Sequence, residues 1–173
     1  IGDLNTEKSN SALFLSADGE NMLTSKVNTD VNKGPIGRGI YESAHNGFSW
    51  RKPRIIGNKV NSDYWETTAS LDLYENILFF VSDREGGYGG RDIWMVKKLP
   101  YGNWSEPQNL GEPINTEYDE ESPFLHPDGK TLYFSSVGHK SMGGFDIFKS
   151  TLNENITWSN PVNIGYPINT VGD

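Results

Sequence analysis

A spacing of 54 residues recurs along this chain of 173 residues and restricts its fold more than any other feature of the sequence. Trp50, Trp104 and Trp158 stand one such interval apart, twice over. The same interval separates three prolines, three glycines and three asparagines, which are Pro53, Pro107, Pro161, Gly57, Gly111, Gly165, Asn61, Asn115 and Asn169. Self-similarity at a fixed period of roughly 20 to 50 residues indicates a repeat architecture. We therefore predict three units, residues 5–60, 61–114 and 115–168, with residues 169–173 opening a fourth.

Each unit has the pattern of four short strands. "PDGK" (127–130) places Asp128 and Gly129 between two apolar runs, and this pair indicates a tight hairpin because glycine tolerates a positive φ. An apolar stretch follows, "LFFVS" (78–82) or "LYFSS" (132–136), and then a Gly-rich loop and two further strands. Four strands in a repeat of this length are typical of a β-propeller blade. We predict an all-β fold with three four-stranded antiparallel blades of about 54 residues, forming part of a larger propeller.

Composition excludes several classes of function. The chain has no cysteine, which removes disulfides, thiolate metal sites and cysteine nucleophiles. Its net charge of -8 argues against nucleic acid or an anionic membrane as a partner, because both attract basic surfaces. No apolar run approaches the ~20 residues of a membrane helix, so we predict no direct insertion into a membrane.

Residues that recur at the same place in successive units are predicted to serve the blade. Asp92 and Asp146 each precede an Ile-aromatic pair, and we expect them to accept hydrogen bonds that fix the preceding Gly-rich loop. Trp50, Trp104 and Trp158 are predicted to anchor the packing between blades. A stacking platform for sugars is the alternative for these three indoles, and it would make the chain a glycan- or peptidoglycan-binding module.

Residues that do not recur are the candidates for binding. The loop "SDREGGYGGRD" (82–92) contains Arg84, Tyr88 and Arg91, and the matching "SVGHKSMGGFD" (136–146) offers His139 and Lys140 instead. Arg and Tyr are over-represented where proteins bind one another. We predict that these five residues bind a protein partner.

Signals for catalysis are weak. The strings H-E-x-x-H, G-x-G-x-x-G and the P-loop are missing, and the three histidines have no partner at ligand spacing, so we predict no catalytic residue, metal or cofactor. A propeller glycosidase is the remaining enzyme alternative, with Glu121 and Asp72 as the pair of carboxylates that it would need. Glu121 ends an acidic run (117–121) that either faces a central channel or forms a solvated connection.

A family resemblance enters at "SPFLHPDGKTLYFSS" (122–136), "MGGFDIF" (142–148) and "GGYGGRDIW" (86–94). These strings resemble the WD-like propeller repeats of the TolB type, in the version found in periplasmic proteins of Bacteroidetes that belong to the OmpA family or to type IX secretion and gliding. The resemblance implies a non-catalytic scaffold that binds protein partners in the cell envelope, in the bacterial periplasm and associated with the outer membrane. The opening "IGDLNTEKSN" has no signal-peptide pattern, so this location rests on the resemblance alone.

The number of units raises a question of closure. Propellers close with about four to eight blades, and three do not suffice. The chain is therefore expected to be a piece of a larger propeller, or to pair as a homodimer that closes a six-bladed ring.

Overall fold

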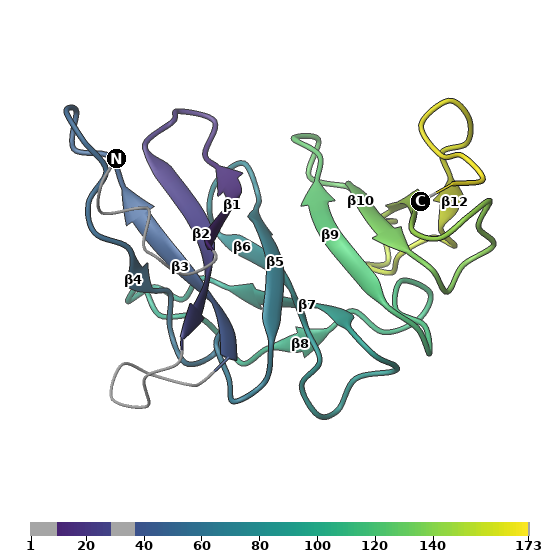
Figure 1. Ribbon diagram of the computed structural model, residues 1–173, viewed down its shortest axis with the longest axis horizontal. Coiled ribbons are helices and arrows are strands. Elements are labelled where there is room, and N and C mark those ends of the chain that lie inside the picture. The colour runs from purple at the N-terminus through teal and green to yellow at the C-terminus, as the bar shows by residue number, and fades with distance from the viewer. Residues whose placement is uncertain (1–9, 29–36, 173) are drawn as a thin grey trace.

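The computed structural model describes residues 10–28 and 37–172, which fold into three four-stranded antiparallel sheets (Figure 1). The first sheet has the order β1 (Asn10–Leu15), β2 (Asn21–Asn28), β3 (Gly37–Ala44) and β4 (Arg54–Ile55). The second contains β5 (Glu66–Leu71), β6 (Ile77–Ser82), β7 (Asp92–Lys97) and β8 (Gln108–Asn109). The third contains β9 (Glu120–Leu125), β10 (Thr131–Ser136), β11 (Asp146–Thr151) and β12 (Val162–Asn163). The all-β prediction of three four-stranded antiparallel sheets is confirmed.

Tight turns close the hairpin between the first two strands of each sheet. In the third sheet Gly129 has a φ of +70°, and its amide donates to the carbonyl oxygen of His126. The carboxylate of Asp128 accepts hydrogen bonds from the amides of Lys130 and Thr131, which lower its pKa. The Asp-Gly signal in the sequence thus corresponds to a turn that satisfies its own backbone donors.

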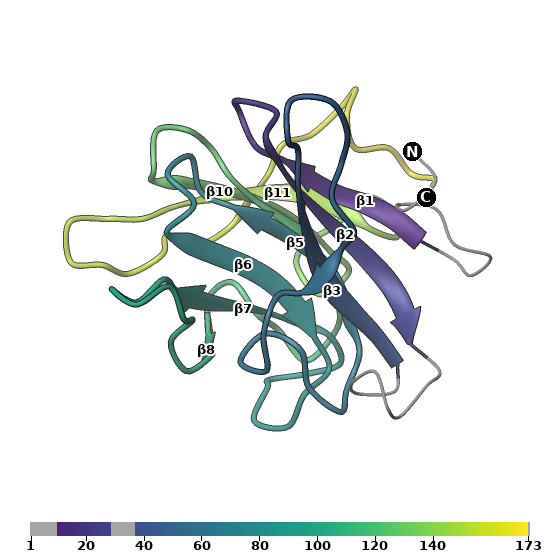
Figure 2. The ribbon, with the colours of Figure 1, turned by 90° about the vertical axis from the view of Figure 1, so that its left-hand side faces the viewer.

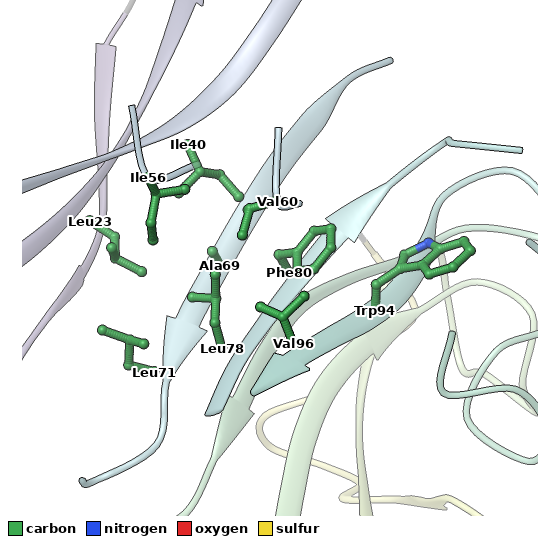
Figure 3. Close-up of a cluster of buried hydrophobic side chains, with 10 residues drawn as sticks. All are labelled: Leu23, Ile40, Ile56, Val60, Ala69, Leu71, Leu78, Phe80, Trp94 and Val96. Carbon is green, nitrogen blue, oxygen red and sulfur yellow. The ribbon is translucent and has the colours of Figure 1, made fainter. Parts of the chain in front are cut away.

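The sheets follow one another along the chain, with the second between the first and the third (Figures 1 and 2). Apolar side chains of the first and second sheets form one core cluster, drawn in Figure 3 and containing Leu23, Ile40, Ile56, Val60, Ala69, Leu71, Leu78, Phe80, Trp94 and Val96. A second cluster joins the second and third sheets and contains Phe79, Val81, Ile93, Ile114, Leu125, Leu132, Phe134 and Phe148. The core therefore lies between sheets, and each sheet depends on its neighbours for burial.

The recurring asparagine closes each sheet against the link that follows it. The side-chain amide of Asn61 donates to the carbonyl oxygen of Ile40, and its carbonyl oxygen accepts from the amide of the same residue. Asn115 makes the same pair of bonds with Ile93, and Asn169 makes it with Ile147. Because this clamp needs both a donor and an acceptor on one short side chain, asparagine returns at the same place in each unit.

Strand connections alternate between two ends of the molecule, because neighbouring strands run in opposite directions. The loop end carries the β6–β7 loop (83–91), the β10–β11 loop (137–145) and the links between sheets (56–65 and 110–119). The hairpin end carries the turns that join the first to the second strand and the third to the fourth strand of each sheet. Within residues 10–28 and 37–172 no helix has the length and apolar character needed to cross a membrane.

Candidate interaction surface

The five residues predicted to bind a partner all lie in the two loops of the loop end, but their exposure differs. Tyr88 and Lys140 are exposed. Arg91 and His139 are half-buried, and the guanidinium group of Arg84 is largely enclosed. The five residues therefore fall into two groups, side chains that face solvent and side chains that are partly or largely enclosed.

Arg84 lies inside the junction between the first and second sheets. Its guanidinium group is 3.0 Å from the carboxylate of Glu66, with side-chain exposures of 9% and 1%. The same group donates to the carbonyl oxygens of Lys59 and Val60 and lies 4.7 Å from the ring centre of Phe80. Burial raises the pKa of Glu66, and the hydroxyl of Ser62 and the charge of Arg84 oppose that rise. Arg84 therefore joins the first and second sheets and presents little surface to a partner.

His139 takes the place of Arg84 at the junction between the second and third sheets. Its Nε2 atom is 2.9 Å from the carbonyl oxygen of Ile114, the counterpart of Val60. Its ring centre lies 5.7 Å from that of Phe134 and 5.1 Å from that of Phe148. Phe134 and Phe148 form a cross-strand pair in the third sheet, as Phe80 and Trp94 do in the second.

Arg91 forms a second bridge between the second and third sheets. Its guanidinium group is 2.7 Å from the carboxylate of Asp119 and 2.6 Å from that of Glu121. The hydrogen bond from Arg91 lowers the pKa of Asp119. Glu120 is fully buried and accepts from the hydroxyls of Thr116 and Ser136. The four carboxylates of the acidic run thus lie in separate environments, and only that of Glu117 is exposed.

The recurring aspartates hold the loops that precede them. Asp92 accepts hydrogen bonds from the amide of Tyr88 and from the side chain of Asn109. Asp146 accepts from the amide of Met142 and from the side chain of Asn163. Burial raises the pKa of Asp92, and the hydrogen bonds from Tyr88 and Asn109 oppose the rise. Each Gly-rich loop is therefore tied to both the third and the fourth strand of its own sheet.

Four exposed aromatic side chains, three of which the sequence reading missed, gather at the loop end. We name them the aromatic rim, and they are Tyr64, Trp65, Tyr88 and Tyr118, with exposures of 37%, 49%, 54% and 53%. The signal in the sequence was the acidic–aromatic pair that follows two of the clamp asparagines, Asn61 and Asn115, in "NSDYWE" and "NTEYDE". These pairs lie in the links between sheets, where the sequence analysis singled out the acidic run (117–121) and none of the aromatic residues.

Contacts across the β6–β7 loop connect the members of the rim. The amide of Trp65 donates to the carboxylate of Asp83 at 2.8 Å. A hydrogen bond with Glu85 is the main cause that raises the pKa of Tyr64. The carbonyl oxygen of Tyr118 accepts from the amide of Gly90 at 3.2 Å. The loop thus lies between the two links and supports aromatic groups from both.

The rim is acidic. Asp63, Asp83, Glu85 and Glu117 are exposed on the same loop and links. The two arginines of this loop already bind carboxylates, Arg84 that of Glu66 and Arg91 those of Asp119 and Glu121. The exposed charge around the rim is therefore negative.

Comparison with known proteins identifies the fold. Neither a protein-family model nor a curated protein sequence matches the chain. Among solved structures, a protein assigned as TolB from Agrobacterium tumefaciens matches with a TM-score of 0.57 and 15% identity, over 92% of this chain and 50% of that one. The chain has a TolB-like propeller fold. It spans about half the length of that structure.

A prolyl endopeptidase structure also matches, with a TM-score of 0.47 and 15% identity, over 90% of this chain and 22% of that one.

In this fold the three sheets are blades. The three tryptophans and the two carboxylates singled out in the sequence lie in different parts of these blades. Trp104 and Trp158 pack against the two core clusters, and Trp50 pairs across a turn with His45. Asp72 accepts from the amides of Asn76 and Ile77 at the hairpin end, whereas Glu121 is the second residue of β9 and lies near the loop end. The two carboxylates nominated for a glycosidase therefore lie toward opposite ends of their strands.

Proposed function

We propose that the chain is a non-catalytic protein-interaction module whose aromatic rim binds a basic segment of a partner protein. The observation that carries the proposal is the combination of four exposed aromatic groups with four exposed carboxylates on one end of the blades. Aromatic side chains provide large contact areas at a low cost in side-chain entropy, and they are enriched where proteins bind.

The chemistry of the rim favours lysine and arginine side chains in the partner. A cation that lies over Trp65 or Tyr118 gains a cation–π interaction of about 0.5–1 kcal/mol at an exposed site. The neighbouring carboxylates of Asp63 and Glu117 add attraction and raise the rate of encounter. The negative charge of the whole chain, -8, acts in the same direction.

The proposal includes a location. The TolB-like fold and the repeat strings that resemble envelope proteins support a place in the bacterial periplasm, in an assembly associated with the outer membrane. Type IX secretion and gliding assemblies of Bacteroidetes are the specific context that the repeat strings favour.

Exposed Lys140 adds a positive charge on the neighbouring β10–β11 loop, where a partner that spans two blades would meet it.

Capture from a cell-envelope extract by the immobilised chain tests the function. We expect the double variant Trp65→Ala/Tyr118→Ala to lose at least about tenfold in capture of the specific partner, which corresponds to two contacts of moderate strength. The matched control is Phe48→Ala/Tyr101→Ala, because these two side chains are also aromatic and are almost fully exposed at the hairpin end. Equal capture by both double variants, or a loss confined to the control, would contradict the proposal.

A further inference from the structure

One turn at the hairpin end combines the groups that a reaction within the chain itself requires. The loop between β3 and β4 begins with "HNGFSW" (45–50), the one place in the sequence where glycine directly follows asparagine. A bridge between His45 and Trp50 closes the turn, and the amide of Asn46 donates to the carbonyl oxygen of Ser49 at 3.0 Å. All four residues between the two bridge partners are exposed. The turn therefore has a defined shape and is open to water.

The side chain of His45 reaches the backbone nitrogen of Gly47. The amide of Gly47 donates to His45 Nδ1 at 3.3 Å, and the described part of the chain offers it no other acceptor. The imidazole lies against Trp50, with the two ring centres 5.2 Å apart. Histidine is the side chain that most often acts as a general base. The nitrogen of Gly47 thus lies next to a base that can take its proton.

The carboxamide group of Asn46 is polarised at its oxygen. Its Oδ1 atom accepts from the amide of Phe48 at 3.0 Å and from that of Ser49 at 2.8 Å. Two N–H donors on one carbonyl oxygen stabilise the negative charge that develops there when the carbon is attacked. Within residues 10–28 and 37–172 the Nδ2 atom of Asn46 makes no hydrogen bond, so nothing in this part of the chain retains it as a leaving group.

Glycine at position 47 leaves the attacking nitrogen accessible. Gly47 has a φ of +90°, in the region that favours glycine. No atom beyond its chain neighbours lies within 4 Å of the place where a Cβ would stand. Neither a side chain of its own nor a neighbouring group therefore shields the nitrogen.

We propose that Asn46 is a site of self-modification, at which the chain converts this asparagine into aspartate or isoaspartate through a succinimide. His45 Nδ1 takes the proton of the Gly47 amide, and the nitrogen attacks Cγ of Asn46. The N–Cγ bond forms while the amides of Phe48 and Ser49 hold the oxygen anion. The Cγ–Nδ2 bond then breaks, and the imidazolium gives its proton to the departing nitrogen, which leaves as ammonia. Water opens the succinimide ring at either carbonyl group.

The reaction changes the surface of the hairpin end. Either product adds one negative charge at neutral pH. Isoaspartate also adds a methylene group to the backbone of the turn, so that Phe48, which is 97% exposed at its tip, is presented differently. The proposal does not depend on the aromatic rim, which lies at the other end of the blades.

The corresponding turn of the third blade lacks two of these features. Asn153 also uses its Oδ1 atom to accept from two amides, those of Asn155 and Thr157, both at 3.0 Å. Glu154 follows it in place of glycine, and its Nδ2 atom donates to the hydroxyl of Thr157 at 2.6 Å. Asn153 is therefore an internal control for Asn46 in the same molecule.

Peptide mapping by mass spectrometry, on the full chain incubated at neutral pH, measures the reaction. The mass of the fragment that contains Asn46 rises by the exchange of NH for O, and labelling with an isoaspartyl methyltransferase detects the isoaspartate. We expect conversion at Asn46 to be at least about tenfold faster than at Asn153. His45→Phe should slow it by about tenfold or more, although this variant keeps an aromatic ring against Trp50.

His45→Gln separates a base from a hydrogen-bond acceptor. Glutamine can accept from the amide of Gly47 but cannot take its proton, so we expect the rate at Asn46 to fall as in His45→Phe. The matched control is His126→Phe, because His126 Nδ1 accepts from the amide of Asp128 at 3.2 Å in a different turn, and the rate at Asn46 should stay unchanged. Melting temperatures show that each variant is folded.

An unchanged rate at Asn46 in folded His45→Phe or His45→Gln would overturn the proposal. So would conversion at Asn46 that is no faster than conversion at Asn153.

Discussion

Removal of the guanidinium group of Arg84 should destabilise the protein strongly. Arg84→Ala leaves the carboxylate of Glu66 in a fully buried place without its counter-charge, and it removes the donors to the carbonyl oxygens of Lys59 and Val60. Loss of one partner of a buried pair costs about 3–5 kcal/mol. For a chain of this length each kcal/mol shifts the melting temperature by about 2–4 °C, so we expect a decrease of about 6–20 °C.

Urea denaturation followed by tryptophan fluorescence measures this loss, because Trp94 lies 5.5 Å from the guanidinium group of Arg84 and reports the junction directly. Lys140→Ala is the control, since Lys140 is exposed on the equivalent loop and its removal should cost less than about 0.5 kcal/mol. The double variant Arg84→Met/Glu66→Leu should recover most of the lost free energy, because it removes both charges and keeps most of the volume. A loss below about 1 kcal/mol in Arg84→Ala would refute the structural role that we assign to this residue.

Two further predictions concern the junction between the second and third blades. Burial raises the pKa of Glu120 above its ordinary value of 4.5, so the folded state binds this proton more tightly than the unfolded state. The stabilising effect of the protonated Glu120 side chain is complete below the ordinary pKa value and is lost as the pH rises through the raised pKa. The free energy of unfolding of Glu120→Gln should therefore improve relative to that of the unchanged chain between pH 4 and pH 8. A constant difference between the two proteins would contradict this. Gly89→Ala should cost about 1–3 kcal/mol in urea denaturation, because its Cβ would lie 2.4 Å from the backbone of Glu117, and Glu85→Ala on the same loop should cost little. A neutral Gly89→Ala would show that the loop and the link separate easily.

The fold was predictable from the sequence because its determinants are local and repeated. Asp128 and Gly129 close a hairpin through contacts within a few residues, and the clamp of Asn115 on Ile93 returns at a constant interval. The repeated positions in the sequence therefore identify the residues that each blade needs for its turns and clamps.

The roles of Arg84 and His139 were not predictable by the same argument. Arg84 was predicted to bind a partner because no similar residue stands 54 positions further along the chain, where the sequence has Gly138. His139 reaches the same place in space from one residue further along, with a different side chain and a similar donor. Long side chains that fold back on the neighbouring blade do not need strict spacing.

Tyr64 and Tyr118 of the aromatic rim were missed for the opposite reason. Tyr64 and Tyr118 do recur, at positions that follow the clamp asparagines by three residues, and recurrence was taken to indicate a structural role. A repeated position can also be exposed, because each link between blades passes through the same end of the molecule.

The exchange of arginine for histidine gives the two junctions different electrostatics on a common plan. In the first junction the buried carboxylate of Glu66 lies 3.0 Å from a guanidinium group that is charged at every accessible pH. In the second, Glu120 is held by the hydroxyls of Thr116 and Ser136, and the only basic group at the equivalent place among the described residues is the imidazole of His139. Because a guanidinium group compensates the carboxylate of Glu66 and burial raises the pKa of Glu120, the second junction should open before the first as the pH rises through the raised pKa of Glu120. Hydrogen exchange resolved by blade at pH 6 and pH 8 measures this order, and earlier opening of the first junction would contradict it.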